Sequence, residues 1–204
     1  MFKLLTGVSL ALALAAAPAS AAVLLSEPGV SEFRPTPGSY TFSFDASADG
    51  TGTIDFSLIA RGSIDGQGAT CGAGDCSDTF NLILNGSDVF YGALRMGGLG
   101  QDMVFISPAG ATITVQSGAL GEGGSARFFL PVQLRAGSNS LTFVYAYAGV
   151  DEGIDEESWA IADLIVRDGS PALVPEPATW ALMITGFGLA GGALRRRTVL
   201  ARPA

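Results

Sequence analysis

Short runs in which apolar and polar residues alternate fill the middle of this chain, and glycine-rich breaks separate them. In the segment 41–46, Phe42 and Phe44 fall on one face of an extended strand, and polar residues occupy the other face. No stretch between the two ends of the chain keeps the 3.6-residue period of an amphipathic helix. The strands predicted from this pattern are Tyr40–Ala46, Thr53–Ala60, Thr79–Leu84, Val89–Leu94, Met103–Ile106, Ala111–Gln116, Ala126–Leu134, Ser140–Ala148 and Trp159–Arg167. Short strands at this spacing predict an all-β fold, an antiparallel two-sheet β-sandwich.

Two of the breaks between strands are typical of hairpin loops. Asn85-Gly86 is the strongest hairpin signal in the chain, because both residues tolerate the positive φ that a type I′ turn requires. Arg135–Asn139, which contains a central glycine, predicts a second hairpin loop.

The N-terminus has the pattern of a secretory signal peptide. Lys3 supplies the positive charge, Val8–Ala17 is the apolar stretch, and Ala19–Ala21 forms a small-x-small cleavage site. The apolar stretch is too short to cross a bilayer. We therefore expect residues 1–21 to be removed after export.

The C-terminus combines a rigid tripeptide, an apolar segment and a basic cluster. The uncharged residues 178–194 would span roughly 25 Å as a helix, slightly less than a hydrocarbon core of about 30 Å. Prolines 175 and 177 keep the chain extended before this helix, and the following arginines favour the cytoplasmic side. These features predict a single transmembrane helix, and on physical grounds a permanent anchor and a temporary one are equally compatible with it.

The same tail resembles the PEP-CTERM sorting signal, in the variant where Trp-Ala follows the tripeptide after two residues. The sorting residues are Pro175, Glu176, Pro177, Trp180, Arg195, Arg196 and Arg197. Such tails occur on exported proteins of Gram-negative bacteria that make exopolysaccharide. The resemblance implies that an exosortase, a membrane-embedded transpeptidase-like enzyme, recognises residues 175–177 and removes the anchor. It divides the chain into a signal peptide (1–21), a β-sandwich domain (22–173) and a sorting signal (174–204).

Charge excludes several classes of partner for the domain between the two ends. The whole chain has 11 basic and 19 acidic side chains, but residues 22–177 keep six arginines against all 19 acids, a net charge of −13. Such a surface repels nucleic acid and anionic membranes. It is compatible with Ca²⁺, neutral sugars or a hydrated extracellular matrix.

Cys71 and Cys76 are the only two cysteines of the chain. In an oxidising compartment they are expected to form a disulfide across a glycine-rich loop. Closing so small a ring stabilises by only about 2 kcal/mol on the chain-entropy model.

A second resemblance concerns the domain itself. The segment 79–90 resembles the strand, Asn-Gly turn and strand of jelly-roll modules that precede such tails, and the segment 157–166 is similar to their final strand. Many relatives of those modules bind carbohydrate or carry a structural Ca²⁺. The pattern departs from theirs at Ala162, where an aspartate is usual, and Asp163 alone keeps a carboxylate.

The chain contains no histidine, which removes the commonest general base, the commonest zinc ligand and every Ser-His-Asp or Cys-His arrangement. Paired carboxylates for glycoside hydrolysis remain open, because their geometry is three-dimensional. We therefore predict that the protein is not an enzyme.

Two groups of residues are candidates for ligand binding. Carboxylates clustered before the last predicted strand suit Ca²⁺, which prefers oxygen ligands; they are Asp151, Glu152, Asp155, Glu156 and Glu157. A solvated acidic loop is the preferred interpretation of these residues. Tyr145, Tyr147 and Trp159 are candidates for a sugar-stacking platform, although a core position is the preferred interpretation of Trp159.

Together these features predict an exported, surface-sorted and non-enzymatic protein of the exopolysaccharide or biofilm matrix. It crosses the inner membrane, is anchored there transiently and then reaches the surface of a Gram-negative cell. Binding of carbohydrate is the first hypothesis for the domain. A purely structural or adhesive protein without a small ligand is the alternative, and a secreted glycoside hydrolase is the third.

Overall fold

The computed structural model describes residues 21–71, 74–147, 157–169 and 186–187. Residues Ala21–Pro171 form one compact unit. The unit 21–171 is an antiparallel two-sheet β-sandwich, and its described residues contain no helix. The predicted all-β fold class is therefore confirmed.

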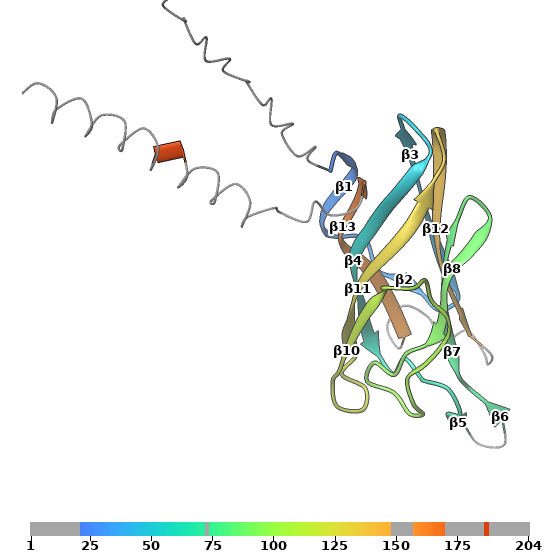
Figure 1. Ribbon diagram of the computed structural model, residues 1–204. Helices are drawn as coiled ribbons and strands as arrows, with labels where there is room; N and C mark the ends of the chain where they lie inside the picture. Colours follow the sequence, from blue (N-terminus) through green and yellow to red (C-terminus); the bar gives the residue numbers. More distant parts are fainter. Residues whose placement is uncertain (1–20, 72–73, 148–156, 170–185, 188–204) are drawn as a thin grey trace, which may run out of the picture. The chain divides into compact units, whose positions relative to one another are not determined.

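The first sheet has the strand order β1-β13-β4-β11-β10, and β2 pairs with β13 as well (Figure 1). Its strands are β1 (Val23–Val30), β2 (Arg34–Pro35), β4 (Gly50–Gly62), β10 (Thr112–Ser117), β11 (Gly124–Leu134) and β13 (Glu157–Asp168). The second sheet has the order β3-β12-β7-β8-β9. Its strands are β3 (Gly38–Ala46), β7 (Asp78–Leu84), β8 (Ser87–Ala93), β9 (Met103–Ile106) and β12 (Gly137–Tyr147). A small hairpin pairs β5 (Thr70–Cys71) with β6 (Gly74–Asp75).

Aromatic side chains on the inner faces hold the two sheets together. Phe56 on β4 and Phe128 on β11 are register partners, and their rings stack with centroids 4.5 Å apart. Phe143 on β12 meets Phe56 edge-on from the opposite sheet, at 5.1 Å. All three rings are fully buried. Burying such rings supplies much of the hydrophobic driving force of a domain of this size.

All nine predicted strands are present, with ends that differ from the prediction by at most three residues. The strand β1 was not predicted, because its Pro28-Gly29 pair is typical of a turn and not of a strand. It is accommodated because β1 is an edge strand that pairs only with β13, and the register shifts between Glu27 and Val30. A proline is tolerated at such an irregular edge, where a missing N–H removes no ladder hydrogen bond.

The two predicted turns have opposite outcomes. Asn85 and Gly86 have φ angles of 53° and 81°, so the predicted type I′ geometry between β7 and β8 is confirmed. The hairpin predicted at Arg135–Asn139 is wrong, because β11 lies in the first sheet and β12 in the second. The segment is an arch that carries the chain from one sheet to the other.

The buried side chain of Asn139 fixes this arch. Its Oδ1 accepts hydrogen bonds from the Arg135 N–H at 3.1 Å and from Asn85 Nδ2 at 2.8 Å. Its Nδ2 donates to the carbonyls of Arg135 at 2.8 Å and Gly137 at 3.0 Å. The arch and the Asn85-Gly86 turn are thus held side by side, and both border the groove described below.

The predicted signal helix lies outside the described residues. Of the predicted transmembrane helix 178–194, only Gly186 and Phe187 are described, and both are helical. Within the described part of the chain, no helix has the length and apolar character needed to cross a membrane.

Candidate functional site

A groove of about 760 Å³ lies between the edges of the two sheets. β10 pairs with residues 124–129 of β11, so the rest of β11 extends beyond it and borders the groove. Residues 51–53 of β4, Asn85 of the turn, the start of β8 and residues 106–109 provide the other walls. Val89, Ile106, Phe129 and Pro131 form apolar parts of the lining.

Polar side chains stand at the rim of this groove. Asp88, Gln133 and Arg135 are exposed there, and Asn85 is half-buried. Pockets of a few hundred to a thousand Å³ with a mainly apolar lining and a few polar groups are typical of small-ligand sites. Asp88 is the only carboxylate among the described residues that line the groove. The lining therefore lacks the pair of carboxylates that glycoside hydrolysis needs.

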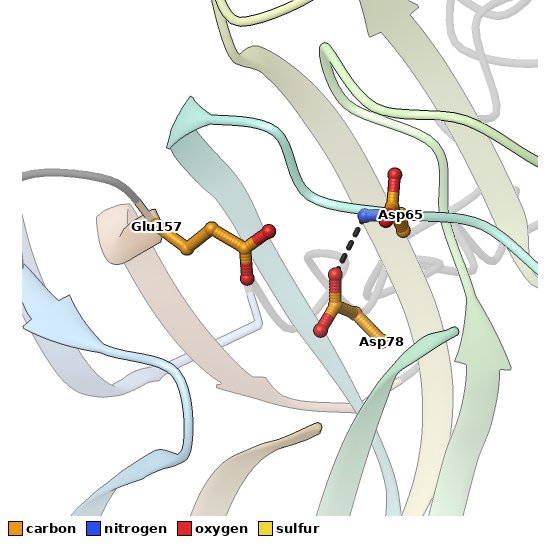
Figure 2. Close-up of side chains that lie close together, drawn as sticks. All are labelled: Asp65, Asp78 and Glu157. Carbon is orange, nitrogen blue, oxygen red and sulfur yellow. Dashed lines mark hydrogen bonds between the residues drawn. The ribbon is translucent and has the colours of Figure 1, made fainter. Parts of the chain in front are cut away.

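A second site is a cluster of buried carboxylates, Asp65, Asp78 and Glu157 (Figure 2). One oxygen from each residue lies within 4.8 Å of the other two. Asp65 follows β4, Asp78 opens β7 and Glu157 opens β13, so the cluster joins the two sheets. The three residues are at most 5% exposed.

Backbone hydrogen bonds hold two of these carboxylates in place. Asp78 Oδ2 accepts from the Asp65 N–H at 2.6 Å, and the Asp78 N–H donates to the Asp65 carbonyl at 3.0 Å. Asp65 Oδ1 accepts from the Leu99 N–H at 2.5 Å. Burial raises the pKa of the Asp65 carboxyl above its ordinary value, and the bond from Leu99 lowers it by less. Three oxygen donors at this spacing are a ligand set that a hard divalent cation prefers.

Of the acidic residues chosen from the sequence as Ca²⁺ ligands, the structure places Glu157 beside carboxylates from other segments of the chain. Glu157 joins Asp65 and Asp78, which are distant from it in sequence. Asp151, Glu152, Asp155 and Glu156 lie outside the described residues, so their role in a Ca²⁺ site stays a prediction. A signal for Asp78 was present: it shares the inward phase of Phe80 and Leu82, but the predicted strand began one residue later.

The sugar-platform hypothesis needs correction for two of its three aromatic residues. Tyr145 and Trp159 are 0% exposed, and their ring centroids are 5.6 Å apart. β12 lies between β3 and β7, and β13 lies between β1 and β4, so inward side chains on both strands are covered. A sugar cannot reach either ring face in this structure, and the core interpretation of Trp159 is the one that agrees with its burial. Tyr147 is half-buried.

Of the two predicted disulfide cysteines, the structure describes the side chain of Cys76 alone. Cys76 is buried next to the β5–β6 hairpin, and its N–H donates to the Ala69 carbonyl at 3.2 Å. The Cys71 side chain is outside the described part, so the disulfide stays a prediction. The sorting residues 175–177, 180 and 195–197 also lie outside it.

Fold and tail together define a β-sandwich domain that is followed by a protein-sorting signal. Residues 173–197 match the PEP-CTERM protein-sorting motif. This motif indicates a secreted, membrane-anchored protein that exosortase processes. The resemblance seen in the tail of the sequence is thereby confirmed.

Solved structures similar to this chain include three carbohydrate-binding modules. A family 35 module from an environmental isolate has 16% identity, covers 76% of this chain and 95% of its own, and has a TM-score of 0.31. A native family 35 module from Clostridium thermocellum has 14% identity, coverages of 74% and 100%, and a TM-score of 0.31. A Xyl-CBM35 in complex with a glucuronic acid containing disaccharide has 17% identity, coverages of 73% and 99%, and a TM-score of 0.32. A search of the curated proteins finds no match. At these TM-scores the similarity carries no argument about the ligand of this chain.

Proposed function

We propose that this chain is an exported, surface-sorted and non-enzymatic protein whose sandwich domain binds neutral carbohydrate of the exopolysaccharide or biofilm matrix. The groove between the sheet edges is the observation that carries the binding proposal. Its volume and its apolar lining with a polar rim suit a short stretch of sugar rings. The net charge of −13 over residues 22–177 favours a neutral glycan over an anionic one.

The sorting part of the proposal rests on the motif at residues 173–197. According to this proposal, the signal peptide directs the chain across the inner membrane of a Gram-negative cell, and the tail holds the chain there until exosortase removes the anchor. The Pro-Glu-Pro segment is the recognition site of that enzyme, and the arginines keep the end of the tail in the cytoplasm.

Replacing both Pro175 and Pro177 by alanine is expected to block processing in a host that contains exosortase. The full-length chain should then accumulate in the membrane fraction at the expense of the released form, measured by immunoblot and intact mass spectrometry. The matched control is Pro171→Ala, which changes a proline just outside the motif. Equal release of both variants would contradict recognition of the tripeptide.

Phe129→Ala is expected to weaken binding of a retained glycan about tenfold, the equivalent of about 1.4 kcal/mol, because it removes an apolar wall of the groove. The glycan is first found on an array of neutral and acidic polysaccharides probed with the full-length chain. Tyr91→Ala is the control: Tyr91 is a half-buried aromatic residue outside the groove lining, and its ring packs against Phe105 at 5.1 Å. Binding that survives in Phe129→Ala but not in Tyr91→Ala would place the sugar elsewhere.

A second candidate function is an adhesive or structural matrix protein without a small ligand. The edge strand β9 favours it, because Met103, Val104, Phe105 and Ile106 are each 41–46% exposed. Consecutive exposed apolar residues on a sheet edge promote association between chains. Concentration-dependent assembly without retention of any glycan would favour this function over carbohydrate binding.

A further inference from the structure

The buried carboxylates Asp65, Asp78 and Glu157 lie outside the groove, and their closeness to one another has an electrostatic cost. Like charges this close repel one another, and burial removes the water that would screen them. Keeping all three charged costs free energy that hydrogen bonds, protons or a cation must offset.

The Tyr145 hydroxyl is an independent observation at the same place. Tyr145 on β12 is the register partner of Phe80 on β7, so Asp78, two residues before Phe80, is its diagonal neighbour on the inner face. The ring also packs against Trp159, two residues after Glu157. The hydroxyl oxygen is fully buried and has no hydrogen-bond partner in the described structure.

The electrostatics of this tyrosine agree with that position. Burial raises the pKa of Tyr145 well above its ordinary value, and the negative charges of Asp78, Glu157 and Asp102 raise it further. The hydroxyl therefore lies within the field of the carboxylates. A fully buried hydroxyl without a protein partner beside an anionic cluster is one that a bound ion or its water would satisfy.

We propose that Asp65, Asp78 and Glu157 bind a Ca²⁺ ion that fastens the two sheets together at this end of the sandwich. Their oxygens, within 4.8 Å of one another, fit around one ion, because ligands on opposite sides of Ca²⁺ are about 4.6–5.2 Å apart. Oxygen donors favour Ca²⁺ or Mg²⁺ over zinc, and the chain has no histidine. Backbone carbonyls or water complete the coordination. This inference is independent of the proposed sugar site.

Such a site couples the ion to folding. Asp78 belongs to the second sheet, whereas Glu157 and the segment after β4 belong to the first. Unfolding separates the ligands, so Ca²⁺ binds the folded chain and stabilises it by mass action. Calcium sites of extracellular modules have dissociation constants of about 10⁻⁴–10⁻³ M. For such constants, Ca²⁺ at about 10 mM should raise the melting temperature by roughly 3–10 °C.

The test is thermal melting of the full-length chain in mild detergent after treatment with EDTA, with and without Ca²⁺. Asp78→Asn and Glu157→Gln are expected to abolish the shift, since each removes one charged ligand and preserves its shape. Asp45→Asn and Glu122→Gln are matched controls at exposed carboxylates and should keep the full shift. An unchanged melting temperature of the wild-type chain, or an equal loss in all four variants, would overturn the proposal.

Terbium luminescence supplies a second measurement that does not depend on stability. Tb³⁺ in the cluster should be sensitised by Tyr145 and Trp159, and Ca²⁺ should displace it. Affinity for Tb³⁺ should fall at least tenfold in Glu157→Gln. A variant with both Asp151→Asn and Asp155→Asn should bind as the wild type does. If that variant loses binding while Glu157→Gln keeps it, the preceding acidic segment holds the ion and the cluster does not.

Discussion

Trp159→Ala should lower the free energy of unfolding by about 3–5 kcal/mol, the range for removing a large buried aromatic side chain. The indole is 0% exposed and packs against three rings from the second sheet. Its centroid lies 5.1 Å from that of Tyr40, 5.6 Å from Tyr145 and 6.2 Å from Phe80. Because natural domains are stable by only about 5–15 kcal/mol, this loss is a large part of the total. Urea unfolding followed by circular dichroism measures it.

Trp159→Phe is the graded control, because it keeps an aromatic ring and leaves a smaller cavity. Its loss should be clearly below that of the alanine variant. The comparison also separates the two interpretations of this residue. If Trp159→Ala lost less than about 1 kcal/mol of stability while abolishing glycan retention, the sugar-platform hypothesis would be correct after all.

Gly97→Ala should destabilise the domain by about 2–5 kcal/mol, because two separate penalties act at this position. Its φ of +81° belongs to the left-handed region, which disfavours side chains. A Cβ would also lie 2.6 Å from the Gly62 carbonyl oxygen and 2.7 Å from the Gly123 Cα, both of them backbone atoms. The Gly123 N–H donates to that same carbonyl at 2.9 Å, so neither neighbour can move without loss of a hydrogen bond.

Gly121→Ala isolates the first of these penalties. Gly121 also has a φ of +81°, but nothing lies within 4 Å of the Cβ that alanine would add. Its loss should be about 1–2 kcal/mol, and the difference between the two variants measures the backbone contact alone. Equal denaturation midpoints for the two variants would show that the chain at Gly97 relaxes away from its neighbours.

Alternation was sufficient to predict nine of the strands, because a half-buried strand repeats every two residues and this repeat is local. Phe42 and Phe44 on β3 illustrate it, since both pack towards the core. The Asn85-Gly86 turn was predictable for a similar reason: the backbone preference of two adjacent residues decides it. The arch at residues 135–139 has a comparable composition, yet it connects different sheets. Composition does not distinguish the two outcomes, because the choice depends on which distant strands pair.

The candidate sites were less predictable than the strands. Glu157 was chosen for the acidic residues beside it in sequence, whereas its described partners are Asp65 and Asp78. The inward phase of Asp78 marks it as buried but does not name its partners, and Asp65 after β4 carries no local mark. Only the pairing of β13 with β4 and the packing of β7 against them bring these two residues to Glu157. The groove could not be predicted for the same reason, since its walls come from four segments that are distant in the sequence, 51–53, 84–89, 106–109 and 129–135.

The sequence by itself determined the all-β character of the domain and the sorting motif at its C-terminus, because both depend on short contiguous patterns. The tertiary structure decided which side chains of those strands are covered and which are brought together. It buried Tyr145 and Trp159, and it joined three carboxylates from distant segments. The physical reason is that burial and proximity depend on the order of strands in the two sheets, and most neighbours in that order are not consecutive in the chain.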